Sequence, residues 1–464
     1  MFNQLTKLST ALISSSVLIL SGCGSTQEKP NSHGQRVGAY KDVRHQQQVS
    51  GDLTKNIPIT YTPRVFRKSS PFGTPITVQA EVLNRSFKNK DSISKFGGSL
   101  DRTYPATGYF YTSFIDERWW LIDPKGHPMV TVGLNSVESI KSPQNTIKMM
   151  KVMGFNSTGA FSKANIEKTK NRLSRTPKLK CMESFGSEFY DATSNGNNHD
   201  FENKVIPVLD PRFEEYCFKK LNATVKSSAI DDPYIIGYYV DNELPWNLDS
   251  LDRTLTLSKE NISKAKAEAW LAQNGGTINA QTRRKFLYFI ADKYYAIVKK
   301  ALKKAAPNHL YLGSRLHSSY KTNEDIVRAS GKYVDVLSVN FYGPWKPDES
   351  HFSLWKKWTN KPVIISEWYT KSADTGLPNA SGAGHVVATQ LDRGNYYQDF
   401  SLALLKSDIV VGWSWHRFID QKPGPVGATS NKGLFDKNGG LYLDLAEKAE
   451  TINNHIYQII DHYK

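Results

Sequence analysis

The chain has 464 residues, of which 39% are hydrophobic and 12% aromatic, so it is long and apolar enough to bury a large core. Its 31 glycine and 21 proline residues are too few to indicate a disordered chain. The formal net charge of +16 favours an anionic partner, which could be nucleic acid, an acidic membrane surface or a charged polymer.

The N-terminus has the features of an export signal. Lys7 precedes the apolar run ALISSSVLIL, which is too short to span a membrane stably. The stretch LSGC, ending at Cys23, resembles the bacterial lipobox, in which the cysteine is acylated; an ordinary secretory signal with a chance cysteine is the alternative. Because Gly24 rather than Asp follows Cys23, the resemblance implies a bacterial outer-membrane lipoprotein, on the periplasmic or the surface face. Export argues against a nucleic-acid partner.

Three segments follow one another along the chain. We expect a signal peptide over residues 1–23, a polar flexible tether over 24–74, and a main domain over 75–464 that begins with strands. Cys181 and Cys217 are the remaining cysteines, and their spacing is neither a zinc pattern nor a disulfide framework. Both are predicted to be small buried hydrophobic residues, with a single disulfide as the alternative.

Short apolar runs alternate with helical patterns from residue 128 onward. This alternation indicates a parallel sheet covered by helices. Eight such units in roughly 330 residues predict an α/β fold, a (β/α)8 TIM barrel with a small N-terminal β extension. A doubly wound open sheet is the competing fold, but no glycine-rich phosphate loop follows any run. The expected strands are 128–137, 155–160, 179–185, 234–243, 310–317, 334–342, 362–368 and 409–418.

Polar and aromatic residues recur where these runs end, which in a barrel is where the active site is built. Glu243 and Glu367, at the ends of the fourth and seventh runs, can both face the central mouth. Glycoside hydrolysis needs such a pair, and a separation of roughly 5 to 5.5 Å would make the enzyme retaining. A lone strand-end glutamate is more often a helix-cap partner or half of an ion pair, so the prediction rests on the coincidence of motifs. Tyr342 is expected to hydrogen-bond Glu367 and hold it ionised.

The pattern of Asn-Glu on the fourth strand and Glu on the seventh is similar to the clan A glycoside hydrolases. More narrowly, the chain resembles family 50 β-agarases and their relatives that act on red-algal galactans such as agar and carrageenan, in stretches including GYYVDNELPW, LSVNFY, PVIISEWY, GWSWHRFID and NKGLFD. The resemblance implies that Glu243 is the acid/base, that Glu367 is the nucleophile and that Asn242 contacts the sugar 2-hydroxyl. It calls for no metal or organic cofactor. Family 50 agarases are usually longer, and SEWYTK replaces their Glu-Phe-His stretch, which predicts a reworked cleft loop.

Substrate contacts are predicted from the remaining strand-end residues. Trp246 and Trp415 are expected to stack on sugar rings, although tryptophans also simply pack cores. Arg315, His416 and Arg417 are expected to meet sulfate groups, since an arginine fork donates two parallel hydrogen bonds. Asn135 completes the expected binding set, and Glu183 is expected to be structural or to touch a sugar hydroxyl.

The predicted activity is exo-cleavage of β-1,4-galactosidic bonds in a sulfated, carrageenan-type oligosaccharide. Within enzymes, the alternative is an exo-β-agarase or a β-galactosidase on neutral galactan. An alternative of another class is a surface lipoprotein that binds polysaccharide without cleaving it. The presence of both carboxylates argues against that last reading.

Overall fold

The computed structural model describes residues 54–62, 74–81, 87, 89–195, 198–227, 230–420 and 430–464. The predicted signal peptide with Cys23, and residues 24–53 of the predicted tether, lie outside the described residues. No helix in the described part of the chain combines the length and the apolar character needed to cross a membrane. Export and lipid anchoring therefore stay predictions from the sequence.

An antiparallel pair of strands begins the described chain: β1 (Thr54–Thr62) lies beside β2 (Thr74–Glu81). The apolar residues of β1 fall at every second position, and Ile59 among them is buried. The prediction of a flexible tether over 24–74 was therefore wrong for residues 54–62, because a short period-two pattern there was hidden among polar flanks. β1 also pairs with β17 (Val386–Val387), which runs parallel to β16 (Lys371–Ser372).

A second antiparallel sheet contains β3 (Tyr111–Ile115), β4 (Arg118–Ile122) and β5 (Pro128–Met129). β3 and β4 lie in the region where N-terminal strands were expected. Arg118 is buried and donates hydrogen bonds to the backbone carbonyls of Leu405 and Val410, at 2.9 and 3.0 Å. These bonds tie the sheet to the C-terminal part of the domain.

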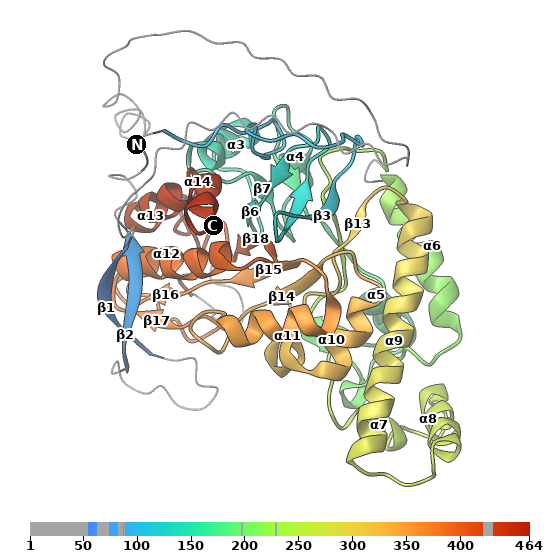
Figure 1. Cartoon of the computed structure of the whole chain (residues 1–464). Coiled ribbons are helices and arrows are strands. Elements are labelled where there is room, and N and C mark those ends of the chain that lie inside the picture. Colours follow the sequence, from blue (N-terminus) through green and yellow to red (C-terminus); the bar gives the residue numbers. More distant parts are fainter. Residues whose placement is uncertain are drawn as a thin grey trace, which may run out of the picture. The chain divides into compact units, whose positions relative to one another are not determined.

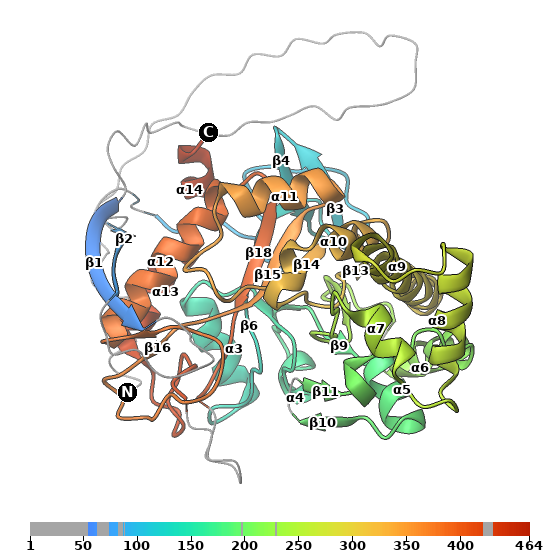
Figure 2. The same cartoon turned by 90° about the horizontal axis from the view of Figure 1, so that it is seen from below.

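Parallel strands form the centre of the domain, and helices lie on their outer side (Figures 1 and 2). Among the described residues, one parallel sheet has the order β14-β15-β18-β6-β7-β8 and another the order β13-β12-β9. Isolated parallel bridges connect Arg175 with Ile235 and Leu316 with Val339, between the two sheets. The predicted α/β fold with parallel strands is confirmed. The strands are β6 (Thr131–Leu134), β7 (Ser157–Thr158), β8 (Ser174–Arg175), β9 (Lys178–Leu179), β12 (Gly237–Val240), β13 (Leu310–Tyr311), β14 (Leu337–Asn340), β15 (Val363–Trp368) and β18 (Val410–Trp415).

The third predicted strand, 179–185, is largely wrong. The strand ends at Leu179, and helix α5 (Met182–Phe189) follows almost at once. The cause is a contact distant in sequence: the carboxylate of Asp241 accepts the backbone N–H groups of Cys181, Met182 and Glu183 at 2.7 to 3.0 Å. A carboxylate that satisfies the free N–H groups of a first turn stabilises a helix start.

Helices follow most of the parallel strands along the chain and cover them from outside (Figures 1 and 2). α11 and α12 each begin with a capping box, formed by Asp348 with His351 and by Thr389 with Asp392. The helices are α3 (Pro143–Val152), α4 (Ala164–Glu167), α5, α6 (Arg212–Ser227), α7 (Ser250–Leu255), α8 (Ile262–Gln273), α9 (Ala280–Ala305), α10 (Glu324–Gly331), α11 (Glu349–Thr359), α12 (Gln390–Lys406), α13 (Leu443–Asn453) and α14 (Ile456–His462). Shorter elements are β10 (Thr193–Asn195), β11 (Asn198–Asp200), and the 3-10 turns η1 (Glu202–Lys204) and η2 (Ser318–Thr322).

Side chains of the parallel strands divide into two buried groups. Ile364 and Val411 belong to a group that contains no helix residue, whereas their neighbours Val363 and Val410 pack in a group with helix residues such as Phe400. Successive residues of a strand point to opposite faces, so one face meets the helices and the other points inward. This alternation holds in the regular part of these strands, and it is interrupted near Glu367, where the pairing of β15 shifts register.

Cys181 and Cys217 form a disulfide bond that links the start of α5 to α6, with their Cα atoms 5.5 Å apart. Both side chains are buried, as predicted, but the preferred reading of two separate thiols was wrong. Their spacing along the chain could not show that α5 and α6 lie side by side.

Candidate active site

The carboxylates of Glu243 and Glu367 meet at one side-chain amide. Nδ2 of Asn340, the last residue of β14, lies 2.8 Å from Oε1 of Glu243 and 3.4 Å from Oε2 of Glu367. Because both oxygens are measured from the same nitrogen, at 2.8 Å and 3.4 Å, they can be no more than about 6.2 Å apart. Ser366 donates a hydrogen bond of 2.7 Å to Oδ1 of Asn340, which orients the amide. The two glutamates therefore face each other, as the sequence predicted.

Irregular backbone geometry directs both glutamates to this point. The pairing of β15 with β14 and with β18 shifts register close to Ser366 and Glu367, and a bulge of this kind re-aims side chains. Glu243 follows β12 with a φ of 51°, and Asp241 has a φ of 60°. Such left-handed conformations cost a non-glycine residue about 1–3 kcal/mol and cluster at functional sites. The hydrogen bonds from the start of α5 to Asp241 hold this strained turn in place.

Arg315 lies beneath the site and is not part of the cavity wall. Its side chain is fully buried, and Nη2 lies 2.5 Å from Oε2 of Glu367. Its Nε donates to Oδ1 of Asn242 at 2.6 Å. The prediction that Arg315 binds sulfate was therefore wrong. Its fork is used within the protein, where it joins the predicted nucleophile to the asparagine next to the predicted acid.

The surroundings of Glu367 favour its ionised form. Burial by itself raises the pKa of Glu367, but the neighbouring His416 and Arg315 and a 3.0 Å hydrogen bond from Tyr342 outweigh burial, so the pKa lies below its usual value. Burial lowers the pKa of His416 to about 3, so this ring is neutral near neutral pH. Arg315 is thus the permanent cation in direct contact with Glu367, and Lys432 lowers the pKa of Glu367 as well. The predicted contact between Tyr342 and Glu367 is present.

A cavity of about 570 Å³ contains both glutamates in its wall. Sequence reasoning about strand ends missed several of its residues, notably Lys321, Tyr369 and Lys432, because they lie in a 3-10 turn or in loops, which carry no periodic signal. Tyr369 and Lys432 do fall in the stretches PVIISEWY and NKGLFD, which carried the family resemblance. The cavity is lined by Glu243, His317, Ser318, Ser319, Lys321, Thr322, Tyr342, Gly343, Pro344, His351, Glu367, Tyr369, Gly382, Ala383, His416 and Lys432.

The other polar residues predicted to bind substrate have different surroundings. Asn242 is buried beside Glu243 and is not part of the cavity wall, but its Nδ2 has no hydrogen-bond partner among the described residues. His416 lines the cavity, with Nδ1 3.8 Å from Oε2 of Glu367. Asn135 is fully buried and donates to the carbonyl of Ser366 at 2.9 Å, and neither it nor Arg417 is part of the cavity wall. The structure therefore does not support the predicted substrate contacts of Asn135 and Arg417.

The two tryptophans predicted to stack on sugars are core residues. Trp246 is fully buried, with its ring 5.6 Å from that of Tyr294. Trp415 packs edge-on against Trp368 at 5.0 Å, on the face of β18 that meets the helices. Since strand residues alternate between faces, Trp415 points outward with Trp413. The stacking prediction was therefore wrong for both.

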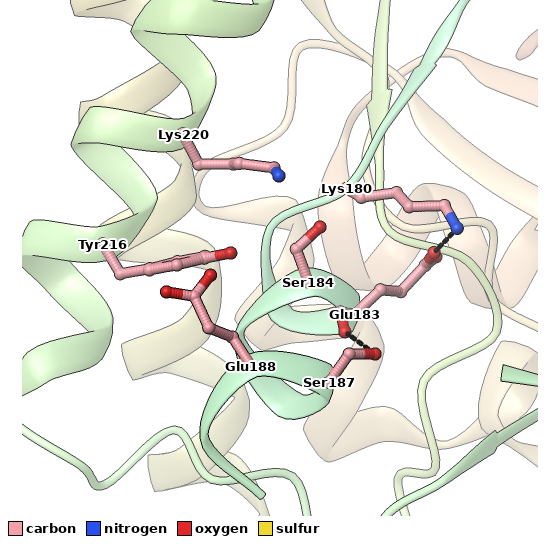
Figure 3. A pocket seen from close by; sticks show the side chains of 7 residues that line it. All are labelled: Lys180, Glu183, Ser184, Ser187, Glu188, Tyr216 and Lys220. Carbon is pink, nitrogen blue, oxygen red and sulfur yellow. Dashed lines mark hydrogen bonds and ion pairs between the residues drawn. The ribbon is translucent and has the colours of Figure 1, made fainter. Parts of the chain in front are cut away.

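Glu183 lies apart from the two glutamates. It is on α5, where its carboxylate lies 2.7 Å from the ammonium of Lys178 and 3.5 Å from that of Lys180. Figure 3 shows the separate pocket that it lines with Lys180, Ser187 and neighbours on α5 and α6. No residue of this pocket lines the glutamate cavity, and the structural role expected for Glu183 fits its ion pairs. No group of three or more His, Cys, Asp or Glu side chains in the described part of the chain could hold a metal ion.

Comparison with known sequences points to agar-degrading enzymes. No family model matches the chain. Curated relatives include β-agarase B of Vibrio sp. (strain JT0107), 25% identical over 315 residues, and β-agarase A of the same strain, 27% identical over 281 residues. The matches cover 58% and 49% of this chain, but 32% and 27% of those proteins. The chain thus spans less than a third of the length of the curated relatives it matches.

Solved structures share the fold more completely. The crystal structure of BpGH50 superposes with a TM-score of 0.76 at 27% identity, covering 89% of this chain and 96% of that one. The agarase AgWH50C gives a TM-score of 0.67 at 23% identity, covering 81% and 67% of the two chains. An exo-β-agarase gives 0.68 at 19% identity, covering 80% and 68%. The chain is therefore similar in sequence to β-agarases and has the fold of the GH50 structures.

Proposed function

We propose that this protein is a glycoside hydrolase of the GH50 type that cleaves β-1,4-galactosidic bonds in agar-type galactan with retention of configuration. The observation that carries the proposal is the Asn340 amide shared by Glu243 and Glu367. It holds Oε1 of Glu243 and Oε2 of Glu367 within about 6.2 Å of each other, below the range of roughly 6.5–9.5 Å between the carboxyl groups that inverting enzymes need to admit a water. The likeness to β-agarases supports the substrate class.

The proposed chemistry uses each side chain in one role. Glu367, kept ionised by Arg315, attacks the anomeric carbon and forms a covalent glycosyl ester while Glu243 protonates the leaving oxygen. Glu243 then takes a proton from the water that hydrolyses this ester. Asn242, whose Nδ2 has no partner among the described residues, donates to the 2-hydroxyl of the sugar being cleaved. These steps need no metal or organic cofactor.

We infer that the parallel strands close into a (β/α)8 barrel of the clan A type. Two isolated bridges support closure, because Arg175–Ile235 and Leu316–Val339 connect the six-stranded and the three-stranded parallel sheets at two places. In such a barrel Asn340 and Glu367 lie at the carboxyl ends of their strands and Glu243 lies just beyond the end of its strand, where active sites are built. An experimental structure with an open sheet would contradict this inference.

Exo-action is part of the proposal. The segment after β15 contributes Tyr369, Gly382 and Ala383 to the cavity wall, and the hydroxyl of Tyr369 accepts the backbone N–H of Ala383 at 2.6 Å. A cavity closed on one side admits a chain end more readily than the middle of a polymer. A time course on reducing-end-labelled agaro-oligosaccharides tests this, because exo-action releases one product size from the start and endo-action releases a spread of sizes.

Hydrolysis itself is tested with purified protein and a panel of neutral and sulfated galacto-oligosaccharides. We expect products whose new anomeric centre is β when first seen by proton NMR, whereas an α product would contradict the retaining mechanism. Glu243→Gln and Glu367→Gln should each lower kcat by about 10²-fold or more. Glu447→Gln, exposed on α13, is the matched control and should leave kcat unchanged. Binding without hydrolysis of any member of the panel would favour the polysaccharide-binding alternative.

We also propose that the protein is exported and anchored to the outer membrane through Cys23. The support is the sequence LSGC after an apolar run. Expression of the wild type and of Cys23→Ser in a bacterial host, followed by membrane fractionation and labelling with a radioactive fatty acid, tests this. The wild type should carry label in the membrane fraction and Cys23→Ser should carry none; equal labelling would refute the anchor.

A further inference from the structure

The positively charged groups around the cavity outnumber the negatively charged ones. Among the described residues that line it, the only carboxylates are Glu243 and Glu367, the two groups assigned to catalysis. Two lysines line the cavity as well: Lys321 from the 3-10 turn η2, and Lys432 from the segment after β18. The cation Arg315 lies beneath Glu367. With Glu243 protonated for its role as an acid, three cations surround one carboxylate. Such a cavity attracts negative charge.

Lys321 is the less expected of these cations. Its side chain is 6% exposed, and its ammonium donates to the backbone carbonyls of Ser318 and Tyr342 at 2.8 and 3.0 Å. An ammonium has three N–H donors; among the described residues the third has no oxygen or nitrogen acceptor, and the Phe341 ring lies 5.3 Å from the ammonium. No carboxylate there forms an ion pair with it, although buried lysines are normally paired. Burial without a counter-ion lowers its pKa to about 8.

Lys321 is also close to the reacting groups. The Lys321 ammonium binds the carbonyl of Tyr342, and Oε1 of Glu367 accepts a hydrogen bond from the Tyr342 hydroxyl. The length of one tyrosine therefore separates the ammonium from the carboxylate, and this length is comparable to the width of a sugar ring. A substituent on the sugar at the cleavage point, or on its neighbour, can reach the ammonium.

Lys432 has a rigid base and a side chain directed at the site. Its backbone N–H donates to Oδ1 of Asp420 at 2.8 Å, and its carbonyl accepts the indole N–H of Trp415 at 3.0 Å. Its ammonium lies 5.4 Å from the centre of the Tyr369 ring. A Cβ added to Gly382 would come within 2.6 Å of this ammonium, so the glycine leaves room for it. Its charge acts on Glu367, whose pKa it helps to lower.

We propose that Lys321 and Lys432 form a subsite for a negatively charged substituent, a sulfate ester or a carboxylate, carried by the galactan that this cavity binds. This inference rests on the proposed function for the identity of the sugar chain. It moves the predicted recognition of sulfate from Arg315, His416 and Arg417 to two lysines that strand-end reasoning did not find. Lysine binds sulfate and carboxylate as a compact point charge, without the paired geometry that arginine requires.

Binding to the Glu243→Gln protein, which cannot complete hydrolysis, tests the subsite. Calorimetry would compare a neutral agaro-oligosaccharide with the same oligosaccharide carrying a sulfate ester and with one carrying a carboxylate. We expect tighter binding of one or both charged forms, and added salt should weaken binding of the charged forms alone. The two charged arms distinguish the two sources of the negative charge. Equal affinity for all three oligosaccharides would overturn the proposal.

Lysine variants in the same background assign the effect. Lys321→Met and Lys432→Met should each weaken binding of the charged oligosaccharide by about 10-fold or more and change that of the neutral one by less than about twofold. Lys437→Met, exposed and outside the cavity wall, is the matched control. Equal loss for charged and neutral forms would show that the lysines only support the loops. Because the two lysines lie on separate segments, misfolding of one variant leaves the other as a test.

Different results would contradict the proposed hydrolase activity and the proposed subsite. If the wild type hydrolyses neutral oligosaccharides and the lysine variants do not discriminate by charge, the subsite is wrong and the hydrolase stands. If no galactan is cleaved but the charged form still binds through both lysines, the subsite stands and the hydrolase is wrong.

Discussion

Arg315 and Glu367 form an ion pair that is closed off from solvent, with Nη2 2.5 Å from Oε2. The side chains are 0% and 5% exposed. A charge buried this deeply is retained only when its partner stays in place. The ionised state of Glu367, and with it the proposed nucleophile, therefore depends on a residue that is not part of the cavity wall.

Arg315→Met should move the acidic limb of the pH profile of kcat/KM to higher pH by about one to three units. Burial, which raises the pKa of Glu367, remains in this variant, while the permanent positive charge that lowers it is gone. At a given acidic pH, a larger fraction of the enzyme then carries a protonated, inactive Glu367. Initial rates on one oligosaccharide between about pH 3 and pH 9 measure the shift, since carboxylates and histidines titrate within this range. An unchanged limb would contradict the assignment.

Stability provides the control for this variant. Removal of one partner of a buried pair costs about 3–5 kcal/mol, and Arg315→Met with Glu367→Gln should recover much of that loss. The direction in which the stability of this pair changes with pH also follows from the pKa of Glu367. The folded-state pKa of Glu367 lies below its ordinary value, so the pair's contribution is present above the unfolded-state pKa and is lost as pH falls through the folded-state pKa. Urea unfolding of the single and double variants near neutral and acidic pH checks both points.

Tyr342→Phe should lower kcat by about 10- to 100-fold with little change in KM. The variant removes the 3.0 Å hydrogen bond to Oε1 of Glu367, and a hydrogen bond to a charged group contributes about 1.5–3 kcal/mol. The acidic limb of the pH profile of kcat/KM should also move to higher pH, because this bond helps to lower the pKa of Glu367. Steady-state kinetics separates the two parameters, and a rise in KM alone would mean that the hydroxyl binds substrate instead.

Trp246→Ala should cost about 3–5 kcal/mol of stability and leave oligosaccharide affinity of the folded protein unchanged. The ring is fully buried between Tyr294 and Tyr295 beneath α9. Urea unfolding and calorimetry with Glu243→Gln as the background measure the two quantities. A large loss of affinity with stability intact would restore the stacking role predicted from the sequence.

Reduction of the Cys181–Cys217 disulfide should lower the free energy of unfolding by about 2–4 kcal/mol. The bond closes a loop of 36 residues between α5 and α6 and therefore restricts the unfolded chain. Thermal unfolding with and without a reductant measures the effect, and Cys181→Ala with Cys217→Ala should match the reduced wild type. Two titratable thiols in the unfolded but unreduced protein would show that the bond is absent.

The sequence by itself determined the alternation of strands and helices and the pair of glutamates. Apolar runs such as PVIISEW and GYYV are local patterns, and hydrophobic periodicity along the chain reports the local structure directly. Because equivalent ends of parallel strands meet at one edge, Glu243, Glu367 and Tyr342 could be predicted to converge without any knowledge of contacts.

Only the tertiary structure decided which neighbouring side chains serve that pair. Trp415 is one residue before His416, yet it packs under the helices while His416 lines the cavity. Arg315 looked like a substrate ligand until its buried partner was known, and the start of α5 depends on Asp241 from another strand. Lys321 and Lys432 reach the cavity from a 3-10 turn and a loop. The reason is physical: a periodic pattern is carried by adjacent residues, whereas burial and charge pairing depend on segments that meet only in the folded chain.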